Sequence, residues 1–341
     1  MNAAVTQRRK VGATPLSLPV MGFGAAHLGE LYEVVTEVDA QTTLAAAWDA
    51  GLRYYDTAPW YGRGLAEHRL GGMLRTRRRD EFQITTKVGR TLHRPADPRA
   101  FDRSPWVGGL NFDVHFDYSY DGVLRSYEQA LQRLSLDTVD ALLIHDLDTL
   151  THGDQKNGHE RALADSGMRA LQELKAGGQI AAIGRGFNTA ESFNDVAGWA
   201  ELDFALVAMP YTLLDQSTLH KGMADCVRRG ISVVIGAPFA SGILVTGSRA
   251  GAMYAYGKAS AAMQEKVRGI EAICAIHQVS MAAAALQFVL AHPAVVSVIP
   301  GAKRASEVMA NIAALDAVIP AAFWADLKTA GLIVADAPVP E

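Results

Sequence analysis

Cysteine is scarce in this chain, which has only Cys226 and Cys274 among its 341 residues. The two are far apart and form no CxxC pair, which argues against a disulfide scaffold and against a cysteine zinc site. No apolar run reaches the ~18 residues of a spanning helix, and the polar start from Met1 to Lys10 does not resemble a signal peptide. The net charge of −4 shows no basic excess that would indicate nucleic acid or an anionic membrane. We therefore expect a reduced, cytoplasmic protein that binds neither nucleic acid nor membranes, and the sequence does not indicate its oligomeric state.

What the chain does contain is a repeated alternation of short apolar strands and amphipathic helices. Eight strands are predicted over residues 20–24, 52–57, 82–88, 141–146, 180–186, 204–209, 231–237 and 295–300. Helices are predicted over residues 39–50, 65–77, 119–134, 166–176, 215–229 and 281–292. Strands rich in Val, Ile and Leu that alternate with helices indicate a buried parallel sheet, and eight such units favour a closed (β/α)8 TIM barrel.

The remaining segments are assigned around this barrel. We expect one domain over residues 1–341 with its core at 20–315, a small hairpin over residues 11–19, and a last helix after residue 315 that frays near Pro338. Three connections are long or polar, namely residues 90–118, 149–159 and 240–262. In a barrel of this kind the loops after the strands form the active-site rim, so substrate specificity is expected there.

Four side chains suited to acid–base chemistry follow three consecutive strands. Asp56 ends the second strand, Tyr61 lies on the loop after it, Lys87 ends the third strand and His145 the fourth. A buried carboxylate needs a cation, and Lys87 on the next strand is the predicted partner of Asp56. An ammonium beside a tyrosine is expected to lower the tyrosine pKa from ~10, and a nearby histidine can orient a substrate oxygen. The group predicts proton transfer at a carbonyl or alcohol oxygen, with a cofactor for the other half of the reaction.

Each of these residues also has a simpler interpretation. The aspartate and lysine would suit a structural ion pair, the histidine a hydrogen-bonded rim residue, and the tyrosine a packed loop aromatic. Lys87 would also suit the nucleophile of a Schiff-base aldolase, and a cofactor-sensing regulatory subunit is a further alternative. His145, His152 and His159 recur every seven residues, but a polar loop of this kind favours a solvated rim, and we predict no metal site.

Five motifs follow one another along the chain, namely Tyr55-Asp56-Thr57-Ala58, Tyr61-Gly62, Glu67, Thr86-Lys87 and Leu143-Ile144-His145. Their order resembles the aldo-keto reductase family from about residue 20 to residue 311. The resemblance implies an NAD(P)-dependent oxidoreductase in which Tyr61 transfers the proton, Lys87 and Asp56 tune it, and His145 orients the substrate. Residues 181–186, 211–216 and 236–244 look most like the branch of D-threo-aldose 1-dehydrogenase, L-fucose dehydrogenase and pyridoxal 4-dehydrogenase.

The resemblance also implies a set of cofactor residues. Gly24 would lie near the nicotinamide ribose, residues 242–247 would fold over the pyrophosphate, and residues 299–304 with Asn311 would hold the adenosine phosphate. Relatives carry Ser-Asn, Gln and Tyr around the nicotinamide where this chain has Gly186-Phe187, Ala208 and Gly236, and Asn188 is the nearest amide. The residues assigned to the cofactor are Gly24, Asn188, Gly242, Gly301, Lys303, Arg304 and Asn311.

The cofactor is chosen from charged residues near the adenosine segment, and the substrate from what the resemblance implies. Glu307 stands where NADP-dependent relatives carry an arginine, which favours NAD, while Lys303 and Arg304 keep NADP possible. The small-molecule substrate implied by the resemblance is a sugar hemiacetal oxidised at C1 to a lactone. Pyridoxal, which also forms a cyclic hemiacetal, fits the same chemistry, and general aldehyde or ketone reduction is the alternative. Trp60, Trp106 and His115 are predicted to line the substrate pocket.

Overall fold

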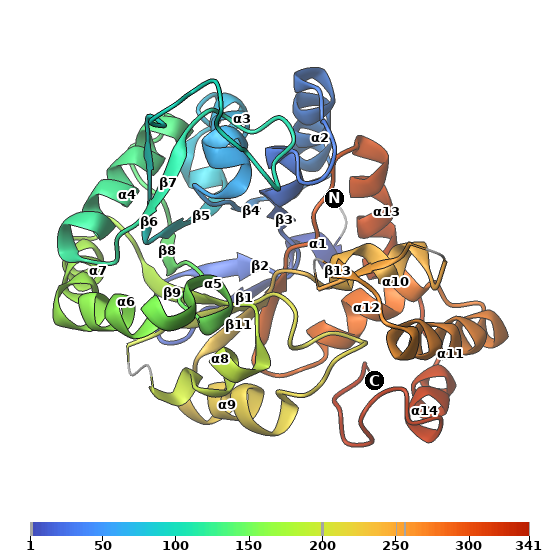
Figure 1. Ribbon diagram of the computed structural model, residues 1–341. Coiled ribbons are helices and arrows are strands. Elements are labelled where there is room, and N and C mark those ends of the chain that lie inside the picture. The colour runs from blue at the N-terminus through green and yellow to red at the C-terminus, as the bar shows by residue number, and fades with distance from the viewer. Residues whose placement is uncertain (1–2, 199–200, 250, 256, 341) are drawn as a thin grey trace.

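Eight parallel strands form one sheet that curls around a common centre (Figure 1). The computed structural model of the chain describes residues 3–198, 201–249, 251–255 and 257–340. Neighbouring strands follow the order β3-β4-β5-β8-β9-β10-β11-β14, so the strands lie side by side in the same order as in the sequence. The strands are β3 (Phe23–Gly24), β4 (Tyr54–Asp56), β5 (Gln83–Val88), β8 (Ala141–Ile144), β9 (Ala182–Phe187), β10 (Phe204–Val207), β11 (Ser232–Ile235) and β14 (Val295–Val298).

The sheet closes on itself between its first and last strands. The amide of Gly22 donates to the carbonyl of Val298 at 2.9 Å, and a parallel bridge joins Gly24 to Gly301. Glycine is needed at position 24, because a Cβ there would lie 2.6 Å from the carbonyl oxygen of Ile299. All eight predicted strands and the predicted (β/α)8 barrel are confirmed, with most strands shorter than expected.

Helices cover the outside of this barrel (Figure 1). The six predicted helices correspond to α2 (Glu37–Asp49), α3 (Leu65–Leu74), α4 (Tyr120–Leu134), α7 (Met168–Ala176), α9 (Ala224–Arg229) and α12 (Met281–Leu290). The structure adds α11 (Ala261–His277) and α13 (Ala305–Asp316), which were not predicted, and the expected last helix is α14 (Ala321–Thr329). Ala337 is buried against the core, so the chain stays packed where fraying was expected. No single helix of the described chain is long and apolar enough to cross a membrane.

Short elements complete the described chain. They are α1 (Ala3–Thr6), α5 (Thr149–His152), α6 (Lys156–Ala162), α8 (Ala190–Asn194), α10 (Ile243–Thr246), and the small strand pair β12 (Met253–Tyr254) and β13 (Gly257–Lys258). Asp148 caps helix α5 from the position before it, because its carboxylate accepts from the amide of Thr151 at 2.8 Å and so satisfies a free donor of the first turn.

An antiparallel hairpin, β1 (Arg8–Lys10) and β2 (Ser17–Pro19), closes the amino-terminal end of the barrel. Its apolar residues Val11, Leu16 and Leu18 join the core inside the barrel. The guanidinium of Arg9 donates to the carbonyls of Leu290 and Val295 at 3.0 and 2.6 Å. The predicted N-terminal hairpin is confirmed, and it leaves the carboxyl ends of the strands as the functional face.

A second hairpin, which was not predicted, rises after the third barrel strand. It consists of β6 (Arg90–His93) and β7 (Asp113–Phe116), paired antiparallel. The segment between them is tied to the rim, since the amide of Val107 donates to the carbonyl of Glu30 at 3.0 Å and the guanidinium of Arg63 donates to the carbonyl of Phe112 at 3.0 Å. This hairpin therefore forms one wall of the barrel mouth.

Candidate active site

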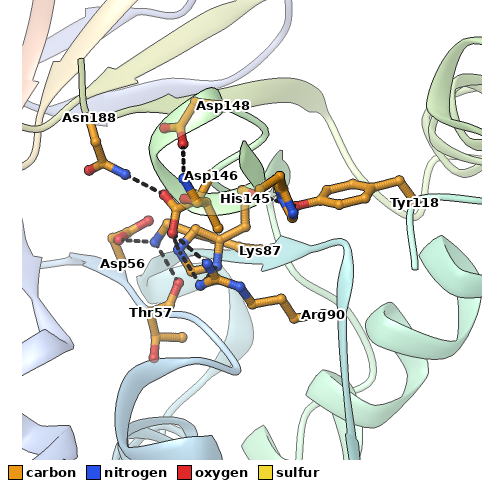
Figure 2. A network of polar contacts seen from close by, with 11 residues as sticks. Asp56, Thr57, Lys87, Arg90, Tyr118, His145, Asp146, Asp148 and Asn188 are labelled. Atoms are coloured by element: carbon orange, nitrogen blue, oxygen red, sulfur yellow. Dashed lines mark hydrogen bonds and ion pairs between the residues drawn. The ribbon is translucent and has the colours of Figure 1, made fainter. Parts of the chain in front are cut away.

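The ends of β4 and β5 hold a buried ion pair. The ammonium of Lys87 lies 2.6 Å from Oδ2 of Asp56 and donates to the carbonyl of Thr57 at 2.8 Å, while the hydroxyl of Thr85 donates to Oδ1 of Asp56 at 2.7 Å (Figure 2). Burial raises the pKa of Asp56, and Lys87 and Thr85 offset part of that rise. The predicted partnership of Asp56 and Lys87 is present, and the Lys87 ammonium donates to two acceptors, the carboxylate of Asp56 and the carbonyl of Thr57.

Tyr61 returns toward this pair from the turn after Pro59. Its amide donates to the carbonyl of Ala58 at 3.1 Å, which reverses the chain over the barrel mouth. The Tyr61 ring centroid lies 4.8 Å from Nζ of Lys87 and 6.1 Å from the ring of His145. The four residues predicted from their positions at strand ends are thus brought together at one rim.

The pKa of Tyr61 moves opposite to the expected direction. Burial raises it well above its usual value, the carboxylates of Asp56 and Asp146 raise it further, and Arg90 opposes them. The expectation of a lowered pKa was wrong because the Lys87 charge is already compensated by Asp56 at 2.6 Å. Tyr61 is therefore a protonated phenol near neutral pH in this arrangement.

His145, directly after β8, has its ring nitrogens engaged by neighbouring side chains. Nη1 of Arg90 lies 3.1 Å from Nδ1 of His145, and Oδ2 of Asp146 lies 3.3 Å from Nε2. The backbone carbonyl of His145 accepts from the Tyr118 hydroxyl at 2.6 Å. Burial and the charge of Arg90 hold the pKa of His145 well below its usual value, so the imidazole is neutral.

Arg90 and Asp146 are two site residues that sequence reasoning missed. Arg90 is only 4% exposed, and its Nη2 lies 2.8 Å from Oδ2 of Asp146 (Figure 2). The other oxygen of Asp146 accepts from Nδ2 of Asn188 at 2.6 Å. Although burial raises the pKa of Asp146, His145, Arg90 and Asn188 together lower it to about 2. Both residues adjoin predicted motifs, since Arg90 follows Lys87 by three positions and Asp146 follows His145 directly.

Of the three predicted pocket residues, two lie at the site. The Trp60 and Trp106 rings meet edge to face at 5.6 Å, and the Tyr61 ring lies 5.9 Å from Trp106. His115 is not brought to the mouth, because its side chain is 58% exposed and its ring stacks on His93 at 4.3 Å. The next residue, Phe116, is itself 39% exposed, but its ring lies 5.2 Å from the guanidinium of Arg90.

The predicted adenosine side lies between the loops after β3 and β14. Nδ2 of Asn311 lies 3.5 Å from the carbonyl of Gly301, next to the paired Gly24. Lys303 forms an ion pair with Glu33 at 2.7 Å, and its amide donates to the carboxylate of Glu307 at 2.9 Å. Arg304 is the residue that precedes the first turn of α13.

The predicted nicotinamide side is open in part. At Gly186 a Cβ would meet nothing closer than the carbonyl oxygen of Ile144 at 3.8 Å, so space lies above this strand end. At Gly236 a Cβ would lie 2.8 Å from Leu206, which occupies part of the room that a larger residue would take. Ala208 is buried, and Asn188 turns to Asp146 instead of standing free.

A nicotinamide dinucleotide fits these residues. The amino terminus of α13, with Lys303 and Arg304 just before it, suits a phosphate because free backbone amides and the helix dipole favour negative charge there. Gly242 adopts a left-handed φ of 95°, and the direction of its missing side chain is open, so the backbone can approach a ligand closely. Among the described residues no group of three or more His, Cys, Asp or Glu side chains is arranged to hold a metal ion.

Comparison with known proteins extends this picture. Residues 20–331 match the sequence model of the Aldo/keto reductase family. The chain is 39% identical to pyridoxal 4-dehydrogenase of Microbacterium luteolum, over 98% of this chain and 100% of the relative. It is 36% identical to D-threo-aldose 1-dehydrogenase of a Pseudomonas species, over 94% of this chain and 96% of the relative. Its fold is similar to that of a holo-form aldo-keto reductase from Bacillus halodurans, with a TM-score of 0.73 and 23% identity over 98% of both chains.

Proposed function

Because the chain belongs to the aldo/keto reductase family and is an NAD(P)-dependent oxidoreductase, we propose that it oxidises cyclic hemiacetals of aldoses or pyridoxal to lactones. The observation that carries the proposal is the convergence of Asp56, Tyr61, Lys87 and His145 on one buried rim. Two relatives named for an aldose and for pyridoxal support the substrate class, because both compounds present a ring hydroxyl on an oxidisable carbon.

In this reaction the side chains manage the proton and the position of the oxygen. Tyr61 takes the proton of the hemiacetal hydroxyl when the substrate is oxidised and returns it when a carbonyl is reduced. Oxidation starts from the phenolate form of Tyr61, which lies beside the Lys87 ammonium that Asp56 holds, and reduction regenerates this phenolate. His145 is kept neutral, and its Nε2, which lies 3.3 Å from Oδ2 of Asp146, exchanges that contact for a hydrogen bond to the substrate oxygen and orients it.

A nicotinamide cofactor, when bound, supplies the two-electron exchange that these side chains lack. Lys303, Arg304, Gly301 and Asn311 would hold its adenosine end and Gly242 its pyrophosphate. We propose NAD as the preferred form, because Lys303 is engaged by Glu33 and by the Glu307 carboxylate, and a 2′-phosphate would meet both negative charges.

A second candidate function is hydride transfer in the opposite direction on another substrate class, the reduction of an aldehyde or ketone to an alcohol. The observation that favours it is the raised pKa of Tyr61, since a phenol that keeps its proton is ready to act as an acid. The Schiff-base aldolase is not favoured, because the Lys87 ammonium is buried and bonded to Asp56 and Thr57.

A substrate screen tests the proposal. Purified protein is supplied with aldoses or pyridoxal and either NAD or NADP, and with simple aldehydes and either NADH or NADPH, and the reduced nicotinamide is followed by absorbance in both directions. We expect turnover with at least one aldose or with pyridoxal, faster with NAD, and a lactone as the product by mass spectrometry. Turnover of open-chain aldehydes alone would replace the proposal by the reductase function, and absence of turnover in both directions would overturn both.

A further inference from the structure

Arg90 is a buried cation that the four-residue proton-transfer group does not include. A guanidinium removed from water is costly unless charges and hydrogen bonds compensate it. Asp146 supplies the charge, with Oδ2 at 2.8 Å from Nη2, and the rings of Trp60 and Phe116 each lie 5.2 Å from the guanidinium carbon. The side chain is thus fixed on several sides at the mouth of the barrel.

The backbone around Arg90 also fixes its position. Gly89 has a left-handed φ of 98°, and a Cβ there would lie 2.2 Å from the Tyr118 ring, so the sharp turn after β5 needs glycine. The hydroxyl of Ser126 on α4 donates to the Arg90 carbonyl at 2.8 Å. The turn at Gly89 and the hydrogen bond from Ser126 together hold Arg90 over the end of the barrel where Lys87 lies.

Asp146 connects Arg90 to His145 on one side and to Asn188 on the other. One carboxylate oxygen lies 2.8 Å from Arg90 and 3.3 Å from Nε2 of His145, and the other accepts from Asn188 at 2.6 Å. Asp146 holds a φ of 44°, in the left-handed region that residues other than glycine seldom adopt, although aspartate is among those that do. The contacts therefore form one chain from His145 through Arg90 and Asp146 to Asn188 (Figure 2).

We propose that Arg90 is a positioning residue that, together with Asp146, fixes His145 and so the substrate oxygen, while Asp146 separately holds Asn188 for the nicotinamide amide. This inference rests on the proposed function, in which His145 orients the oxygen, and on the assignment of Asn188 from the sequence as the amide nearest the nicotinamide. Its consequence is that loss of Arg90 disturbs the chemical step, whereas loss of Asp146 also loosens cofactor binding.

The charges around His145 define what Arg90 does to it. Burial and the positive charge of Arg90 lower the pKa of His145, Asp146 raises it, and Lys87 lowers it further. Tyr61 faces the ring as a neutral phenol. Without Arg90, the Asp146 carboxylate would keep its contact with His145 and lose its cation. The ring would then accept a proton to replace that cation, and an imidazolium would compete with Tyr61 at the substrate oxygen.

Kinetics of Arg90→Met, Arg90→Lys and Asp146→Asn test the positioning role. For Arg90→Met we expect kcat to fall about 10²-fold with KM changed by less than about threefold, because misplacement by ~1 Å has effects of this size. Arg90→Lys, which keeps the charge, should recover at least about tenfold of that loss. Asp146→Asn should weaken NAD binding about tenfold by fluorescence quenching, while Arg90→Met leaves it within about threefold. A kcat within about twofold of the parent for Arg90→Met, or unchanged NAD affinity for Asp146→Asn, would overturn the proposal.

A titration of histidine ring signals by NMR tests the same contact without turnover. His145→Gln identifies the His145 signal by its loss. Between about pH 8 and pH 5 we expect this signal to stay at its neutral position in the parent and in Arg90→Lys, and to shift toward imidazolium in Arg90→Met. A titrating signal in the parent, or a silent one in Arg90→Met, refutes the contact. If Arg90→Met does not fold, as judged by circular dichroism, a titrating His145 in Arg90→Lys serves as the refuting result and a silent one as support. Because the NMR titration needs no turnover, its outcome does not depend on the substrate screen. Failure of the proposed function and failure of this inference are therefore distinguishable.

Discussion

The proposed proton-transfer group and the proposed adenosine side of the same rim are built in opposite ways. Asp56 and Lys87 are almost fully buried and every charge has a partner within hydrogen-bond distance. At the adenosine side the Lys303 and Glu33 side chains are 27% and 46% exposed and form an ion pair with each other. Charges taken out of water must be paired before any substrate arrives, whereas exposed charges are free to exchange water for a ligand. The first region is therefore preorganised for chemistry, and the second is tuned for binding.

The largest effect that separates the two regions is expected from Tyr61→Phe. Removal of the hydroxyl should lower kcat by about 10²- to 10⁴-fold, the usual contribution of a general acid or base, and leave NAD affinity unchanged. Steady-state kinetics and fluorescence titration measure the two quantities. The control is Tyr120→Phe, whose hydroxyl donates to Glu173 at 2.6 Å on the outer helix layer and should not affect either. Full activity in Tyr61→Phe would remove the proton-transfer assignment.

Loss of a lysine should distinguish the regions by stability. Lys87→Met leaves Asp56 buried without its cation, and we expect the free energy of unfolding to fall by about 3–5 kcal/mol. Lys303→Met removes an exposed ion pair and should change it by less than about 1 kcal/mol. Urea denaturation of both variants measures the difference. Equal losses would show that burial does not separate the two regions.

The catalytic part of this contrast was predictable because its residue types occur at definite positions. Asp56, Lys87 and His145 end strands that the apolar pattern predicts well, and parallel strands bring their carboxyl ends to one face. Arg90 could not be placed, since it reaches the site only through a hairpin that depends on pairing with residues far along the chain. His115 was misplaced because adjacent residues of a strand face opposite sides, so the ring beside Arg90 is that of Phe116 and not of His115.

The dependence of the rate on pH should appear in the chemistry and not in cofactor binding. Oxidation requires the phenolate of Tyr61, and burial raises its pKa, so kcat/KM for oxidation should increase as pH rises through neutrality toward alkaline values. Reduction requires the phenol, and its rate should stay level over the same range. Initial rates in both directions, with NAD affinity at each pH, measure this. An oxidation rate that is flat across neutrality would show that bound substrate or cofactor lowers the Tyr61 pKa.

A smaller effect is expected from the carboxylates of the adenosine side. The double variant Glu33→Gln and Glu307→Gln should tighten NADP binding about fivefold, equivalent to ~1 kcal/mol, because both charges oppose a 2′-phosphate. NAD affinity should stay the same, and the gain should shrink at high salt. Glu265→Gln on α11, which removes an exposed carboxylate paired with Arg268, is the control. Weaker NADP binding in the double variant would contradict the assignment of NAD.

The smallest effect is expected at His115. Because its side chain points away from the mouth, His115→Ala should change kcat/KM by less than about twofold, within the range of ordinary surface substitutions. Phe116→Ala, one position further, should lower it clearly, since this ring packs against Arg90. Comparison of the two variants with one substrate measures which face of β7 lines the pocket, and a larger loss at His115 would reverse the orientation.

The closure of the barrel has a consequence for how the chain is made in the cell. The seam joins β3 to the segment after β14, and the contact of Arg9 with Val295 spans 286 residues. At about 5–20 residues per second of synthesis, the early strands wait roughly 15–60 s for their last partner. During that interval the open edge of the growing sheet offers unpaired amides and carbonyls to other nascent chains. The yield of folded protein in an expression host should therefore respond to chaperone supply and to growth temperature more than to the composition of the finished surface.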